Sequence, residues 1–200
     1  MSTRTDRQND FLRAAIDIVS RNGFSKLTIR NVASAVGVTE PAVYRHFPTK
    51  LALLEAMLEE LQSALLPHFY RLKRGSSSPR RTFEEFIKGL FEEFRIRPAY
   101  APFIFSEEIF HNEAQLKKKL QEVMSENIRV LTWAFGEWQQ NESCRTDIPP
   151  QEIALLTLAS IRLSVSRWHI SEGELGLAGL AESIVSTLTT LFNLKGGKDA

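Results

Sequence analysis

Residues 28–50 read TIRNVASAVGVTEPAVYRHFPTK and describe two short helices joined by a tight corner. Thr28 is placed to cap the first helix, whose apolar residues follow at helical spacing up to Gly37. Thr39 is placed to cap the second helix, and Pro41 lies in its first turn, where a missing N–H costs little. We therefore predict a helix, a turn that contains glycine, and a very short second helix.

The second helix has few apolar residues with which to hold itself in place. Val43 and Phe47 are the two that it would bury. Its outer side would then carry Glu40, Pro41, Ala42, Tyr44, Arg45 and His46. Two helices joined in this way match the helix-turn-helix, whose second helix enters the DNA major groove. Any corner between two helices needs a glycine and caps, however, so the local pattern alone leaves an ordinary structural corner as an equal alternative.

Charge is distributed unevenly along the 200 residues, although the formal net charge is only +1. Residues 1–50 contain eight Lys or Arg against four Asp or Glu, whereas residues 51–200 contain seventeen against twenty. A positive front end suits a surface that faces a polyanion. The excess is small by itself, because many proteins with a similar surface bind no nucleic acid.

The rest of the chain shows helical periodicity and no alternating pattern typical of a strand. We expect an all-α protein of about nine helices, with an N-terminal three-helix domain over residues 1–50 and a larger helical domain over 51–200. The helix that connects them is expected to begin at about residue 49. Further helices are expected over residues 79–97, 98–111, 113–141, 150–172 and 177–193.

Three features limit the class of protein. The N-terminus is polar, and no run of about 18 apolar residues could span a membrane, so we expect a cytoplasmic protein. The single cysteine, Cys144, predicts neither a disulfide framework nor a zinc site. We find no arrangement of nucleophile, base and orienting residue and no glycine loop for phosphate, so we expect neither an enzyme nor a cofactor.

The order of residues between Gly23 and Leu54 is more specific than the helical pattern. The segment closely resembles the N-terminal signature of TetR-family transcriptional regulators through Gly23, Phe24, Thr28, Val32, Ala33, Ala35, Gly37, Val38, Ala42, Tyr44, His46, Phe47, Lys50, Leu53 and Leu54. The resemblance covers about a quarter of the chain. It implies a homodimer that places one short helix of each subunit in the major groove of a near-palindromic operator. Members of this family usually repress transcription until a small molecule binds the helical body.

The resemblance also implies roles for individual residues. Phosphate contacts are expected from Thr28, Tyr44 and Lys50. Base reading is expected from Arg30, Glu40, Pro41, Ala42 and Arg45, and structural support of the motif from Gly37, Thr39 and His46. Glu40 is the unusual member, because its negative charge repels phosphates unless a cytosine amino group, a nearby arginine or a helix N-terminus offsets it.

In the body, the resemblance implies a dimer interface and an effector site. The interface would use the helices over 150–172 and 177–193, although packing within one subunit could account for about half of their apolar positions. An apolar or aromatic effector would bind among residues that include Phe91, Phe94, Phe103, Phe105, Phe110, His111, Trp133 and Trp168. An aromatic residue at helical spacing more often belongs to the core, so this set is a hypothesis about a subset of core aromatics.

Two alternatives stay open. One is a helical metal-binding bundle or enzyme, because Glu108 and His111 have the spacing found in carboxylate-bridged di-iron proteins. That site needs a second Glu-x-x-His, and neither His68 nor His169 has a glutamate three residues before it. The other is a family member that binds DNA without responding to a ligand.

Overall fold

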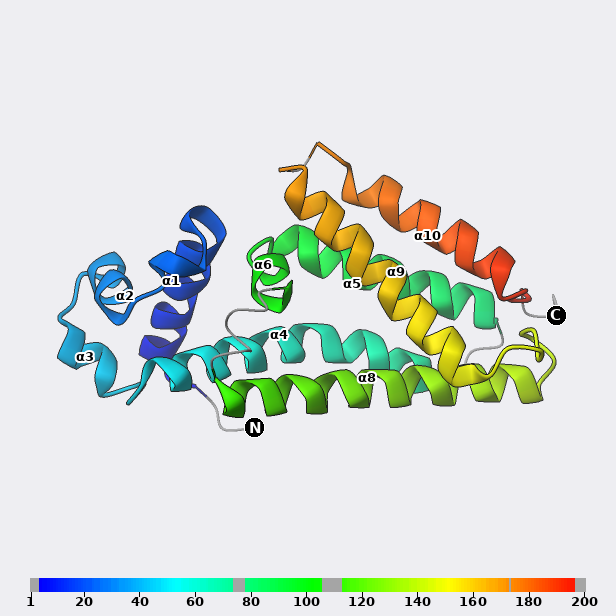
Figure 1. Ribbon diagram of the computed structural model, residues 1–200, viewed down its shortest axis with the longest axis horizontal. Helices are drawn as coiled ribbons and strands as arrows, with labels where there is room; N and C mark the ends of the chain where they lie inside the picture. Colours follow the sequence, from blue (N-terminus) through cyan, green and yellow to red (C-terminus); the bar gives the residue numbers. More distant parts are fainter. Residues whose placement is uncertain (1–3, 74–77, 106–112, 173, 197–200) are drawn as a thin grey trace. The chain divides into compact units, whose positions relative to one another are not determined.

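The computed structural model describes residues 4–73, 78–105, 113–172 and 174–196. Every regular element in these ranges is a helix (Figure 1), which confirms the all-α prediction. The nine α-helices and one 3-10 helix of these ranges are α1 (Asp6–Asn22), η1 (Phe24–Lys26), α2 (Ile29–Val36), α3 (Glu40–Tyr44), α4 (Lys50–Lys73), α5 (Pro79–Ile96), α6 (Tyr100–Phe105), α8 (Ala114–Gln140), α9 (Pro150–Ile170) and α10 (Leu177–Leu191). None of the helices described is long and apolar enough to cross a membrane.

The chain divides into two compact units. The first comprises residues Met1–Gln62 and Arg97–Leu120, and the second comprises Ser63–Ile96 and Gln121–Ala200. Helices α4 and α8 each run from one unit into the other. The predicted boundary near residue 50, between an N-terminal three-helix domain and a larger helical domain, stays a prediction.

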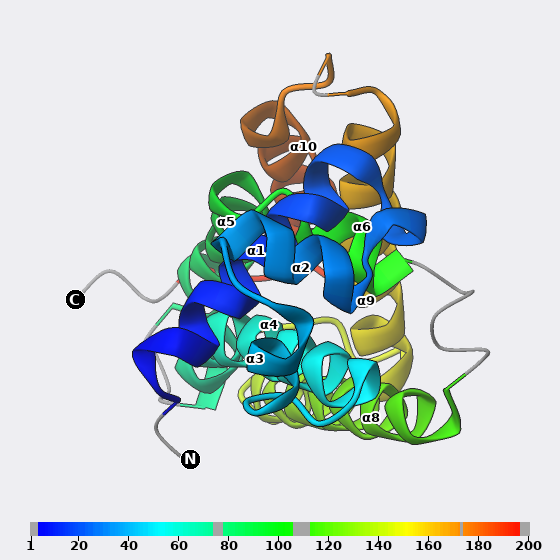
Figure 2. The ribbon, with the colours of Figure 1, turned by 90° about the vertical axis from the view of Figure 1, so that its left-hand side faces the viewer.

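The first unit contains the predicted helix-turn-helix, and Figure 2 shows its helices α1, α2 and α3 towards the viewer. Helix α1 begins with a capping box formed by Thr5 and Gln8 and packs against α2 and α6. The ring of Phe11 on α1 lies 5.5 Å from the ring of His46 and 6.4 Å from that of Phe47. These aromatic contacts tie α1 to the segment that follows α3, so the motif rests on a small core of its own.

The second unit has a core of aromatic rings. Phe83 of α5 and Phe135 of α8 lie 5.7 Å apart between ring centroids. Both contact Trp138 and Phe192 edge to face. Helix α5 packs against α9 and α10, which closes this core. Rings packed edge to face contribute to stability beyond the area that they bury.

Candidate nucleic-acid interface

The corner after α2 is set by the backbone of one glycine. Gly37 has φ 71° and ψ 37°, in the left-handed region that side chains disfavour. A Cβ at this position would meet nothing within 4 Å, so the requirement for glycine is conformational and not steric. The N–H of Val38 donates to the carbonyl of Ala33 at 2.9 Å and closes the end of the helix. At the other end, the side-chain oxygen of Thr28 accepts from the N–H of Asn31 at 3.1 Å, as its capping position predicts.

The cap of α3 differs from the prediction. Thr39 occupies the capping position, but its side chain accepts no hydrogen bond from the helix. A capping side chain normally accepts from the second or third helical N–H. Pro41 removes the second of these donors, and the third, the N–H of Ala42, donates to the carbonyl of Thr39 at 3.0 Å. The prediction that the Thr39 side chain caps this helix was therefore wrong.

Two buried residues hold α3 in the motif. Val43 and Phe47 are buried, and the N–H groups of His46 and Phe47 each donate to the carbonyl of Val43 at 2.9 Å. The ring of His46 packs on Phe11, as described above. The remaining outer side of this five-residue helix is available to a partner.

The three residues expected to contact phosphate are all exposed. Tyr44 is 45% exposed at the end of α3, and Thr28 and Lys50 are exposed at the starts of α2 and α4. Helix α4 is capped by Thr49, whose side-chain oxygen accepts from the N–H of Ala52 at 3.0 Å. Lys50 is thus the first residue of a capped helix, where the positive helix end also favours an anion.

The structure brings together two of the residues expected to read bases. The Nε of Arg30 on α2 lies 3.6 Å from the Oε1 of Glu40, the first residue of α3. Both side chains face solvent, being 84% and 45% exposed. Pro41 and Arg45 are also exposed, and Ala42 is half-buried. Arg30 is therefore a nearby arginine of the kind that offsets the negative charge of Glu40.

The residues expected around an effector do not form one group in the described structure. Phe91 and Phe94 are buried on α5, Trp133 is 44% exposed on α8, and Trp168 is half-buried on α9. Phe103 belongs to the first unit, where its ring stacks on that of Phe24 at 5.7 Å. The side chain of Phe105, and the whole of Phe110 and His111, lie outside the described residues. The effector site stays a prediction.

The alternative metal site falls outside the described ranges, because Glu108 and His111 both do. Among the residues that are described, no three His, Cys, Asp or Glu side chains gather closely enough to hold a metal ion.

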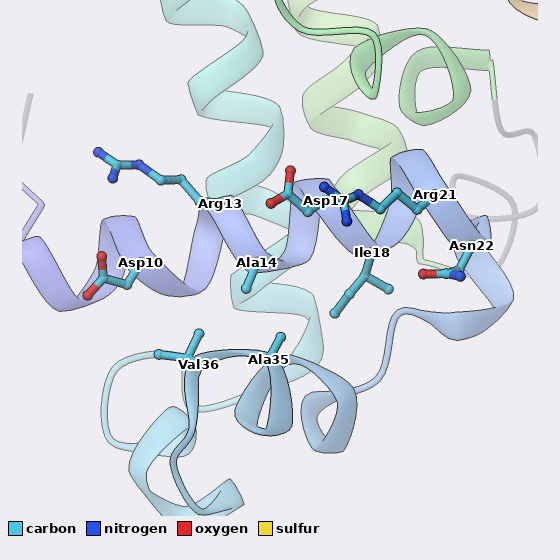
Figure 3. Close-up of a pocket in the computed structure, with 9 residues that line it drawn as sticks. All are labelled: Asp10, Arg13, Ala14, Asp17, Ile18, Arg21, Asn22, Ala35 and Val36. Carbon is cyan, nitrogen blue, oxygen red and sulfur yellow. The ribbon is translucent and has the colours of Figure 1, made fainter.

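A hollow of about 500 Å³ lies between α1 and α2 and was not predicted (Figure 3). Its walls include Asp10, Arg13, Asp17 and Arg21 on one side of α1, together with Ala35 and Val36 of α2. These four charged residues of α1 recur at steps of three and four in the sequence, and that spacing could have revealed the row. Two aspartates balance two arginines, so the row favours neither an anion nor a cation.

The segment that builds this interface also matches a known protein family. Residues 11–57 match the model of bacterial regulatory proteins of the tetR family. The match covers most of α1, all of α2 and α3 and the first turns of α4, which are the elements that build the interface. The N-terminal quarter of the chain is thus similar to the TetR family. The resemblance inferred from the order of residues is thereby confirmed.

A relative of this chain is the nucleoid occlusion factor SlmA of Actinobacillus pleuropneumoniae. The two are 28% identical over 116 residues, which are 58% of this chain and 57% of that protein. The match therefore spans little more than half the length of the relative.

Two solved structures share the fold of the whole chain. The fatty acid degradation regulator FadR from Bacillus halodurans has a TM-score of 0.82 and 13% identity, covering 97% of this chain and all of its own. FadR from Bacillus subtilis, in complex with stearoyl-CoA, has a TM-score of 0.77 and 16% identity, covering 90% of this chain and 96% of its own. At these identities the two structures show a shared fold, and the family model shows that the N-terminal segment is similar to bacterial regulatory proteins.

Proposed function

We propose that the protein is a homodimeric, sequence-specific transcriptional repressor of the cytoplasm that a small apolar or aromatic effector releases from its operator. The observation that carries the proposal is the division of α3 into two sides. Val43 and the following Phe47 are buried, whereas Tyr44 and Arg45 are exposed. A five-residue helix cannot be stable through its own propensity, so its caps and buried residues serve to present its outer side.

The proposed phosphate contacts flank the proposed reading residues. Thr28, Tyr44 and Lys50 carry donors that suit phosphate oxygens, and such contacts fix register without selecting sequence. Arg30 and Arg45 can fork onto guanine, and Pro41 and Ala42 can pack on a thymine methyl. Their exposure supports this assignment, because each side chain reaches solvent at least in part.

The proposed dimer interface uses the outer side of α9. Along this side, exposed residues and the half-buried Ser166 follow alternating steps of three and four, in the order Leu156, Ala159, Leu163, Ser166 and Ile170. This spacing is typical of helices that pair along a seam. Leu163 and Ile170 are 63% and 76% exposed, which is unusual for large apolar side chains in one row. A second copy of the chain would cover them and would supply a second reading helix for a near-palindromic operator.

The phosphate contacts can be tested by titration of an operator captured from genomic fragments. Tyr44→Ala and Lys50→Ala should each weaken binding about tenfold on every DNA sequence, and Lys50→Ala should lower the salt slope by about one. Lys118→Ala removes an exposed lysine of α8 and is the matched control, expected to bind as the wild type does. Full affinity in both interface variants would overturn the proposed contacts.

The dimer can be tested by sedimentation. Leu163→Glu should convert the dimer to a monomer and abolish tight operator binding, because a charge would replace the centre of the apolar seam. Met124→Glu places the same charge at an exposed apolar residue of α8 and should leave the dimer intact. A dimer that survives Leu163→Glu would place the interface elsewhere.

The effector can be approached with two classes of probe. Stearoyl-CoA is the ligand in the structure of the Bacillus subtilis regulator, and it supplies an acyl chain as the apolar probe. A simple bicyclic aromatic is the second. At least a tenfold loss of operator affinity is expected with one class. If neither class releases DNA, the alternative of a family member without ligand response gains support.

A further inference from the structure

The ion pair between Arg30 and Glu40 joins the two helices of the motif on their solvent side. Arg30 is the second residue of α2, and Glu40 is the first of α3. Their separation of 3.6 Å is that of an ion pair rather than of a short hydrogen bond. An exposed pair of this kind contributes little to stability. Its position therefore matters more than its contribution to folding.

The geometry leaves the reading end of Arg30 free. Glu40 approaches the Nε side of the guanidinium, and the group as a whole is largely in solvent. The two terminal Nη groups can then donate together to O6 and N7 of one guanine. An unrestrained arginine loses rotamer entropy when it is fixed against a base. A carboxylate that already restrains the side chain reduces that loss.

Glu40 also has an effect on DNA that lacks the correct base. A carboxylate beside the major groove repels the phosphates of any duplex, whatever its sequence. Only a duplex that engages Arg30 well compensates for this repulsion. The same residue thus lowers non-specific affinity and raises the advantage of the correct site.

We propose that Glu40 is a positioning residue that aims Arg30 at a guanine and opposes non-specific binding, and that it does not read a base itself. The proposal rests on the proposed function, since it assigns roles within the same DNA-binding surface. It predicts that the effect of Glu40 on base preference passes entirely through Arg30.

The test is selection of duplexes from a random pool at physiological salt, followed by titration of the selected duplex and its single-base variants. The wild type should select a guanine whose preference is lost in Arg30→Ala. Glu40→Gln keeps the shape of the side chain and removes its charge. It should reduce the preference for that guanine about three- to tenfold and should tighten binding to a non-specific duplex. Glu122→Gln, at an exposed glutamate of α8, is the matched control and should change neither quantity.

The decisive variant combines Arg30→Ala with Glu40→Gln. If Glu40 positions Arg30, adding Glu40→Gln to Arg30→Ala changes no base preference. If Glu40 reads cytosine directly, a cytosine preference persists in Arg30→Ala and disappears in the double variant, which overturns the proposal. An unchanged guanine preference in Glu40→Gln alone also overturns it. Failure of the wild type to enrich any sequence is a different result, because it contradicts the proposed function itself.

Discussion

The helix-turn-helix of the first unit and the second unit contain helices of very different length. In the first, α2 and α3 have eight and five residues. In the second, α5, α9 and α10 have 18, 21 and 15 residues. The short helices depend on a threonine cap, a left-handed glycine and a few buried side chains, whereas the long helices surround a cluster of aromatic rings. The helix-turn-helix therefore uses local contacts to present a surface, and the second unit uses long-range packing to make a stable body.

The largest effect is expected from the aromatic core. Phe135→Ala should lower the free energy of unfolding by about 3–5 kcal/mol, because it leaves a cavity beside Phe83, Trp138 and Phe192. Trp133→Ala removes a larger ring from the same helix but from an exposed position, and it should cost about 0.5 kcal/mol or less. Urea denaturation followed by circular dichroism measures both. Equal losses would mean that the rings of this cluster do not dominate the stability of the second unit.

A smaller effect is expected where two long helices approach closely. A Cβ at Gly89 of α5 would clash with Nδ1 of His68, whose Nε2 lies 3.4 Å from Oε1 of Glu93. Gly89→Ala should therefore cost about 1–2 kcal/mol despite the better helix propensity of alanine, because the nearly buried imidazole must move. Thermal unfolding measures the loss.

A second glycine provides the matched control for this contact. At Gly136 of α8 the nearest atom to a new Cβ is 4.0 Å away, so Gly136→Ala should be neutral or stabilising. Adding His68→Ala to Gly89→Ala should recover part of the loss through non-additive coupling. If the two glycine variants behave alike, close packing of α5 on His68 is not what requires Gly89.

These two regions also differ in how much of them the sequence could predict. The corner at Gly37 and the cap at Thr28 depend on residues within a few positions of each other, so local pattern was sufficient. The lack of a side-chain cap at Thr39 was not predicted. It depends jointly on Pro41, which has no N–H, and on the hydrogen bond from the N–H of Ala42 to the carbonyl of Thr39, although both features are local. The contact of Gly89 with His68 joins the successive helices α4 and α5 and depends on how they pack, so it leaves no mark on periodicity.

The aromatic residues show the same limit at the proposed sites. Helical spacing indicated that the side chain of Phe103 belongs to the core or to an effector site. It could not reveal that the ring of Phe103 stacks on that of Phe24 in the first unit. The order of residues identified Arg30 and Glu40 separately. Their ion pair required the angle between α2 and α3, which follows from the left-handed backbone of Gly37 and from packing.

The caps of the first unit permit a sharper test of its dependence on local contacts. Thr28→Ala should cost about 1 kcal/mol, because the N–H of Asn31 loses its acceptor. Thr39→Ala should cost less than about 0.5 kcal/mol, since that side chain accepts no hydrogen bond from α3. Hydrogen exchange of the amides in α2 and α3 reports local opening, and about fivefold faster exchange is expected in α2 of Thr28→Ala only. Similar acceleration in both variants would contradict the difference between the two caps.

The smallest effect concerns an ion pair within the first unit. Oε1 of Glu59 on α4 accepts a hydrogen bond from Nζ of Lys119 at 2.6 Å, and Arg4 lies 3.3 Å from Oε2. Chiefly the Lys119 hydrogen bond, and also Arg4, lower the pKa of Glu59 below its ordinary value of 4.5, although partial burial opposes the shift. A lowered pKa in the folded state means that this stabilisation is complete above pH 4.5 and is lost as the pH falls through the lowered pKa.

Glu59→Gln should therefore cost a few tenths of a kcal/mol at pH 7, since the side chain is half-exposed and solvent screens the pair. The difference from the wild type should shrink towards zero below pH 4 and should also shrink in high salt. Glu122→Gln, at an exposed position, should cost less than Glu59→Gln at pH 7. A difference that grows as the pH falls would have the wrong sign for this pair. The first unit would then have to be stabilised at α4 by packing alone, as the second unit is at its aromatic core.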